Sequence, residues 1–273
     1  MPINNERVSY VAYARKRIVY HLKRNPLRLF RFLNPKIIGN SLASHQLREA
    51  RRLGDWNGER DSRQERFAAS DNWMVGNGLA RREYQTYDDY IANQRSKLER
   101  VETQLRKHQD DAYNRFRSMF EACDALKGRR NVLCLGARIG SEVKALIDLG
   151  YVAIGIDLNP GDNNPYVLYG DFHNLIFGDS SFDAIYTNTM DHCLDPEKMV
   201  AEIVRLLIPK GLFIMDVTRG YDEGMSVDVD HSALAWSKAS DFVSFVTELG
   251  RFDCIAHYEL PDPPWTQALL IKR

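Results

Sequence analysis

The sequence lacks several features that would place it at once in a simple class of protein. Its four cysteines form no Cys-x-x-Cys pair and show no metal-ligand spacing, and no run approaches the roughly 18 apolar residues of a membrane span. The N-terminus has no apolar core or cleavage site of a secretory signal. These absences exclude a disulfide-rich miniprotein, and we expect a cytoplasmic protein.

The formal net charge is zero, because 37 basic residues balance 37 acidic ones, but the two signs are distributed unevenly along the chain. Residues 1–40 carry nine basic residues and one acidic residue, a charge of +8, which leaves residues 41–273 at −8. Apolar positions at helical spacing make residues 7–36 a basic amphipathic segment. Such a segment can pack on its own domain, make peripheral contact with an anionic membrane, or, less expectedly, bind nucleic acid.

After the basic N-terminal residues 1–40, which we call the basic head, the chain shows two further regions. Residues 41–128 are predicted to form a helical accessory or lid region, with an irregular glycine-containing part at 54–80 and helices at about 86–105, capped by Thr86, and 111–127. Residues 129–273 alternate short apolar runs with helical stretches, which is typical of an α/β fold. We predict a Rossmann-like, seven-stranded, mostly parallel sheet with one antiparallel strand. The expected strands cover residues 131–135, 152–158, 166–169, 182–187, 212–217, 252–260 and 266–271.

The first strand of this region ends in a glycine turn that is suited to a ligand. Gly136 permits a tight turn and Gly140 a close approach of the next helix. Asp157 follows Gly136 by 21 residues, at the end of the next strand, where a carboxylate can accept hydrogen bonds from both ribose hydroxyls. The pattern indicates an adenosine-type ligand. It departs from Gly-x-Gly-x-x-Gly, because Arg138 and Ser141 replace two glycines, and this argues against NAD and FAD.

The stretch 131–217, with Ser181-Phe182-Asp183-Ala184-Ile185-Tyr186 in its fourth strand region, resembles a class I S-adenosylmethionine-dependent methyltransferase of the broad type-11-like group. The resemblance implies an S-adenosylmethionine site in which the glycine turn holds the methionyl part, Asp157 the ribose and Asp171 the adenine. Arg138 is unusual for the family, and we expect it to pair with Asp171, Glu142 or the methionine carboxylate. The implied cofactor residues are Gly136, Ala137, Arg138, Gly140, Asp157, Leu158, Gly170, Asp171, Phe172, Asn188 and Thr189.

Methyl transfer to a hydroxyl or protonated amine needs a base, and His192 and His231 are the candidates, each following a predicted strand. Asp191, Asp216 and Asp228 lack a recognisable ligand spacing, so we expect no metal site. The loop at Asn188 is not the Asn/Asp-Pro-Pro-aromatic loop typical of nucleic-acid base methylation. We therefore expect a small-molecule, sugar or lipid-linked acceptor. A non-catalytic cofactor-binding module and an RNA methyltransferase that uses the basic head stay open as alternatives.

Overall fold

The computed structural model describes residues 65–225, 227–260 and 265–273. The chain divides into two compact units, Met1–Ala69 and Ser70–Arg273, and all of the described strands belong to the second unit. The predicted basic segment at residues 7–36 lies outside the described residues. The predicted division into residues 1–40, 41–128 and 129–273 stays a prediction.

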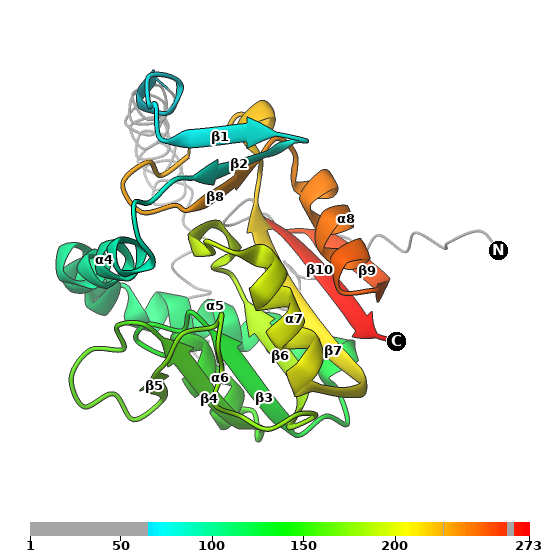
Figure 1. The fold of residues 1–273 in the computed structure, drawn as a ribbon. Helices are drawn as coiled ribbons and strands as arrows, with labels where there is room; N and C mark the ends of the chain where they lie inside the picture. Colours follow the sequence, from blue (N-terminus) through cyan, green and yellow to red (C-terminus); the bar gives the residue numbers. More distant parts are fainter. Residues whose placement is uncertain (1–64, 226, 261–264) are drawn as a thin grey trace, which may run out of the picture. The chain divides into compact units, whose positions relative to one another are not determined.

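A seven-stranded sheet lies at the centre of the second unit (Figure 1). Strands β3 to β7 pair in parallel, and β10 runs antiparallel to both of its neighbours. The structure thus confirms the predicted Rossmann-like, mostly parallel sheet with one antiparallel strand. In spatial order the strands are β5 (Val167–Tyr169), β4 (Val152–Asp157), β3 (Asn131–Leu135), β6 (Phe182–Thr187), β7 (Leu207–Thr218), β10 (Trp265–Lys272) and β9 (Phe252–Glu259).

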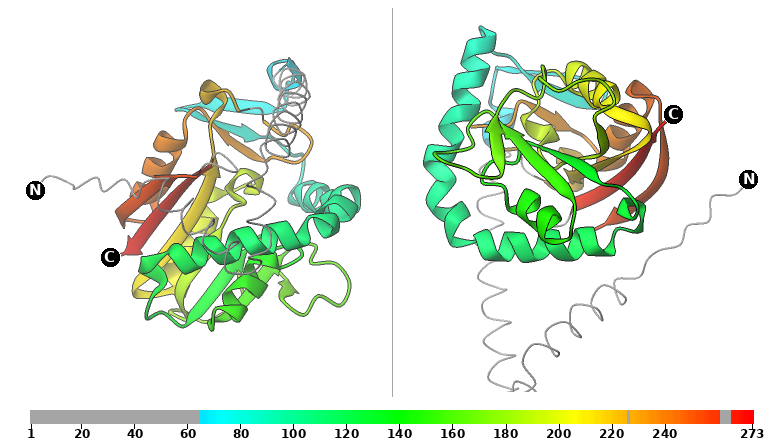
Figure 2. Two further views of the ribbon diagram at one scale, coloured as in Figure 1. Left: turned by 180° about the vertical axis from the view of Figure 1, so that it is seen from behind. Right: turned by 90° about the horizontal axis from the view of Figure 1, so that it is seen from below.

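Helices cover both faces of the sheet because its inner strands are apolar on both sides. In β3, Leu133 and Leu135 pack into the cluster that includes α7 (Pro196–Leu206) and α8 (Ala239–Leu249). The alternate residues, Val132 and Cys134, belong to the cluster of α5 (Gln109–Ala122) and α6 (Ser141–Asp148). Figures 1 and 2 show α7 and α8 on one face and α5 on the other.

A second, three-stranded antiparallel sheet was not predicted. It consists of β1 (Trp73–Gly76), β2 (Leu79–Arg82) and β8 (Leu234–Trp236). Residues 54–80 were expected to be irregular because of their glycines, but Asn77 and Gly78 both have positive φ, at 53° and 75°, and connect β1 to β2 as a two-residue hairpin turn. The Asn-Gly pair was the available signal in the sequence.

Helix α4 (Tyr87–Lys107) begins with the predicted cap, in which Thr86 and Asp89 bond each other's backbone amides. The following helix, α5, ends at Ala122 and not near residue 127, because the short helix η1 (Asp124–Leu126) turns the chain and buries Leu126. The right-hand view of Figure 2 shows α4 and α5 as two long arms that meet at a corner. Within the described residues, no helix has both the length and the apolar composition that crossing a membrane requires.

Candidate functional site

The turn after β3 is compact and attached to β4. Gly136, Arg138 and Gly140 all have left-handed backbone, with φ values of 71°, 44° and 79°. The amides of Gly136 and Ala137 donate to the carbonyl of Ile156 at 2.8 and 3.1 Å, which fixes the turn against the neighbouring strand. Gly140 then stands at the N-cap of α6. The predicted glycine turn is therefore present, although Arg138 adopts a conformation that favours glycine.

Gly136 is also required by its contact with the segment after β6. A Cβ at Gly136 would lie 2.7 Å from Thr189 Cγ2 and closer still to Thr189 Oγ1. Thr189 cannot move away freely, because its hydroxyl bonds Thr187 Oγ1 at 3.0 Å and donates to the carbonyl of Leu135 at 3.3 Å. The structure thus places the predicted residues Gly136 and Thr189 in contact, at the carboxyl ends of adjacent strands.

Because of this contact, we expect alanine to reduce the free energy of unfolding more at Gly136 than at Gly128, a glycine with similar backbone geometry. Gly128 has φ of 79° and nothing within 4 Å of a built Cβ, so Gly128→Ala should cost only the left-handed penalty, about 1 kcal/mol. Gly136→Ala should lower the free energy of unfolding by about 1–3 kcal/mol more, because the methyl group overlaps Thr189. Urea denaturation of both variants measures the difference. An equal loss of unfolding free energy in both variants would show that the turn can shift to accommodate the methyl group despite the contact with Thr189.

Asp157 lies at the carboxyl end of β4, beside the glycine turn. Its carboxylate accepts from the amide of Arg138 at 2.9 Å and from the amide of Asn159 at 2.8 Å, one on each oxygen. Burial raises its pKa above the ordinary value, against the effect of nearby Arg138 and of these amides. A carboxylate offers about four acceptor positions, so both oxygens can still accept from a ligand. Leu158, the next predicted residue, is buried against Tyr90 of α4.

The segment after β5 brings Gly170, Asp171 and Phe172 to the same edge of the sheet. Asp171 accepts from the amide and from Nδ1 of His173, both at 2.9 Å, and from the hydroxyl of Tyr87. Burial alone would raise the pKa of Asp171, but these hydrogen bonds together lower it. His173 also accepts from the amide of Asp195 through Nε2 at 3.2 Å, so it braces this loop.

The two predicted bases lie close together, although 39 positions separate them in the sequence. His192, in the short helix η2 (Met190–His192), directs Nδ1 to the carbonyl of His231 at 3.1 Å. Burial lowers the pKa of His192 to about 4 and also lowers that of His231, whose Nδ1 lies 3.5 Å from Asp228. Both imidazoles are therefore neutral near pH 7, and His192 is a weak base. Asn188 lies next to Thr189, just past the end of β6.

The structure also describes the surroundings of Arg138 and of the three aspartates that were considered as metal ligands. Among the described residues, Arg138 forms no ion pair within 4.0 Å with Asp171 or Glu142, but its charge lowers the pKa of Glu142. Asp216 is buried and accepts hydrogen bonds from Tyr186 and Gln267. Over the described ranges, no group of three metal-ligating side chains comes together.

Helix α4 lies in the predicted accessory or lid region, but the sequence did not indicate which residues of the sheet edge its side chains contact. Tyr87, Tyr90, Gln94 and Lys97 follow a three-four-three spacing and so share one face of the helix. Each meets a segment at the sheet edge: Asp171, the carbonyl of His192, the carbonyl of His231, and Nε2 of His192 respectively. The helical periodicity was visible in the sequence, but nothing in the sequence indicates which residues these four side chains contact.

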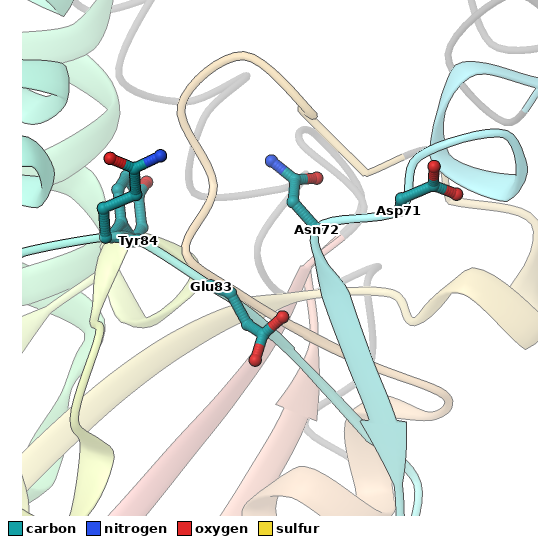
Figure 3. Close-up of a pocket in the computed structure, with 5 residues that line it drawn as sticks. Asp71, Asn72, Glu83 and Tyr84 are labelled. Atoms are coloured by element: carbon teal, nitrogen blue, oxygen red, sulfur yellow. The ribbon is translucent and has the colours of Figure 1, made fainter.

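A separate hollow of about 480 Å³ opens beside β1 and β2 (Figure 3). None of the predicted site residues is among its described lining residues, which are Asp71, Asn72, Glu83, Tyr84 and Gln85. Its side chains are exposed or half-buried, and two of them are carboxylates. The predicted site is therefore the edge beneath α4, not this hollow.

Comparisons with known proteins agree with this geometry. Residues 133–215 match the model of a methyltransferase domain family. The sequence matched no curated protein. A Burkholderia thailandensis 1,6-didemethyltoxoflavin-N1-methyltransferase, solved with 1,6-didemethyltoxoflavin and S-adenosylhomocysteine, is 17% identical, with 73% of this chain and 97% of that chain covered and a TM-score of 0.55.

A second solved structure, a possible histamine N-methyltransferase from Thermotoga maritima, is 16% identical over 64% of this chain and 98% of that chain, with a TM-score of 0.48. The family match covers β3 to most of β7, the part of the sheet that carries the glycine turn and Asp157. Residues 133–215 therefore match a methyltransferase domain, and the chain shares the fold of the solved Burkholderia methyltransferase, in agreement with the resemblance found in its sequence motifs.

Proposed function

We propose that this chain transfers the methyl group of S-adenosylmethionine to a small-molecule, sugar or lipid-linked acceptor. The observation that carries the proposal is the convergence of the glycine turn, Asp157 and Asp171 at the carboxyl ends of β3, β4 and β5. Ligands of open α/β sheets bind at this edge.

The donor groups present fit the cofactor. Asp157 would hold the ribose hydroxyls with the acceptor positions that its two backbone amides leave open. Asp171 would accept from the adenine amino group, in exchange for the hydroxyl of Tyr87, and the left-handed turn at Gly136–Gly140 would hold the methionyl part. The cofactor supplies the activated methyl group, and this chain's residues bind and orient it.

A small acceptor is favoured by the way the chain covers its own site. Helix α4 bonds the carbonyl of Leu158 after β4 and the backbone of His192 after β6, and also residues 230–231 before β8. An acceptor must therefore enter beside α4, which favours a small molecule or a slender end of a larger one. The solved Burkholderia enzyme of the same fold binds a small heterocycle, 1,6-didemethyltoxoflavin.

Two measurements on the full chain test the proposal. Isothermal titration with S-adenosylhomocysteine should show binding, and methyl-labelled S-adenosylmethionine incubated with a fractionated cell extract should label the metabolite or lipid fraction. Label confined to RNA would replace the proposal with an RNA methyltransferase. Binding without any labelled product would indicate a non-catalytic module, and absence of binding would contradict the cofactor assignment.

A further inference from the structure

Lys97 lies near the middle of α4, on the face that meets the sheet edge. Its Nζ lies 2.5 Å from Nε2 of His192, and the side chain is partly buried. A lysine that covers a helix surface normally keeps its ammonium group in water. Here the amine instead points inward, to the segment that follows β6, where acceptors are expected to bind.

The hydrogen bonds of His192 fix the chemical state of this contact. The carbonyl of His231 can only accept, so Nδ1 of His192 carries the proton that the 3.1 Å contact requires. In the neutral ring, Nε2 then has a lone pair and accepts from Lys97. His192 is consequently occupied at both nitrogens: one holds the His231 backbone and the other holds the lysine amine.

The surroundings of Lys97 make its amine easier to deprotonate than an exposed lysine. Burial, together with the nearby charge of Arg138, lowers its pKa to about 8, against the opposing effect of nearby carboxylates. The groups that act on it come from several elements: Arg138 from the turn after β3, Asp157 from β4, Asp191 and His192 from η2, and Asp228 and His231 from the segment before β8. Near neutral pH a fraction of the amine is therefore neutral and able to accept a proton.

We propose that Lys97 is the group that takes the proton from the methyl acceptor, and that His192 is a positioning residue that holds the lysine amine in place. This inference rests on the function proposed above. The acceptor atom bonds the methyl carbon as the carbon–sulfur bond breaks, the bonding pair stays on sulfur, and the acceptor's proton moves to the lone pair of Nζ. Lys97 becomes an ammonium group, which then loses its proton to solvent.

The first test measures the titration of Lys97 by NMR, both in the free protein and with S-adenosylhomocysteine bound. The Cε–Hε signal is assigned by its absence in Lys97→Met. Its midpoint should lie near pH 8 in the wild-type protein. It should change in His192→Asn, which keeps a donor for the His231 carbonyl but removes the acceptor for Lys97. A midpoint near 10.5, the ordinary lysine value, would overturn the proposal.

The second test compares two substitutions at the same position. Lys97→Arg keeps a positive charge but cannot lose a proton in this pH range, whereas Lys97→Met removes both charge and base. Both should reduce labelled methyl transfer into the metabolite or lipid fraction by at least about 100-fold, the usual contribution of a general base. Both should bind S-adenosylhomocysteine within about threefold of wild type.

The outcomes separate this inference from the function on which it rests. If Lys97→Arg retains transfer, the side chain serves as a cation and the proposal fails. If Lys97→Met weakens S-adenosylhomocysteine binding more than tenfold, Lys97 belongs to the cofactor site and the proposal also fails. Absence of transfer by the wild-type chain would instead contradict the proposed methyltransferase function.

Discussion

Replacing Asp157 with asparagine should weaken the binding of S-adenosylhomocysteine by about 100-fold, because the cofactor loses charged hydrogen bonds to its ribose and the site loses part of its shape. The carboxylate accepts from the amides of Arg138 and Asn159 on separate oxygens. An asparagine side chain offers one oxygen, so its amino group must face one of these backbone donors. The glycine turn would then lose an anchor while the ligand loses an acceptor.

Asp162→Asn is a matched control for this substitution. Asp162 lies in the same connection between β4 and β5, is exposed, and is five residues from Asp157. Isothermal titration should give this variant the wild-type affinity, since the change in charge is equal but no site contact is lost. If Asp157→Asn binds within threefold of wild type, Asp157 does not hold the ribose and the cofactor pose described above is wrong.

Local signals in the sequence were sufficient for the seven-stranded sheet and for the grouping of the proposed cofactor residues at its edge. The strand that ends at Leu135, the turn at Gly136 and Gly140, and Asp157 after the next strand lie within 27 residues. Strand–helix alternation places successive strand ends at one edge of a parallel sheet, so their proximity follows from topology. For this reason the sheet and the spatial grouping of these residues could be predicted without coordinates.

The contribution of α4 could not be predicted, because its partners are distant in sequence. Lys97 meets His192 across 95 positions, and Tyr87 meets Asp171 across 84. The spacing of Tyr87, Tyr90, Gln94 and Lys97 shows that they share a helix face but does not say what that face covers. Burial, which determines the weak basicity of His192, likewise depends on packing that no local pattern encodes.

Glu142 offers a separate test of how the core beneath the site responds to pH. It lies in the first turn of α6, where a carboxylate is ordinarily favoured by the helix dipole, yet the residue is only 5% exposed. Burial, with an added contribution from the charge of Asp157, raises its pKa from 4.5 to about 8, against the effect of Arg138. The folded protein therefore keeps Glu142 protonated at pH values at which the unfolded chain ionises it.

The sign of the pH dependence follows from this difference. Between about pH 4.5 and 8 the folded state binds more protons at Glu142 than the unfolded state, so the free energy of unfolding falls as the pH rises. Between pH 5 and 9 the wild-type protein should lose on the order of 4 kcal/mol more than Glu142→Gln, which has no proton to lose.

Urea denaturation at both pH values measures this difference, with Glu121→Gln as the control on an exposed position of α5. Titrating groups that do not interact with Glu142, including Asp216 with its pKa raised to about 6 by burial, contribute alike to all three proteins and cancel in the comparison. Glu121→Gln should follow the wild-type curve. Parallel curves for wild type and Glu142→Gln would mean that water reaches Glu142 or that α6 shifts to expose it. In either case the carboxyl below the glycine turn would be charged at neutral pH.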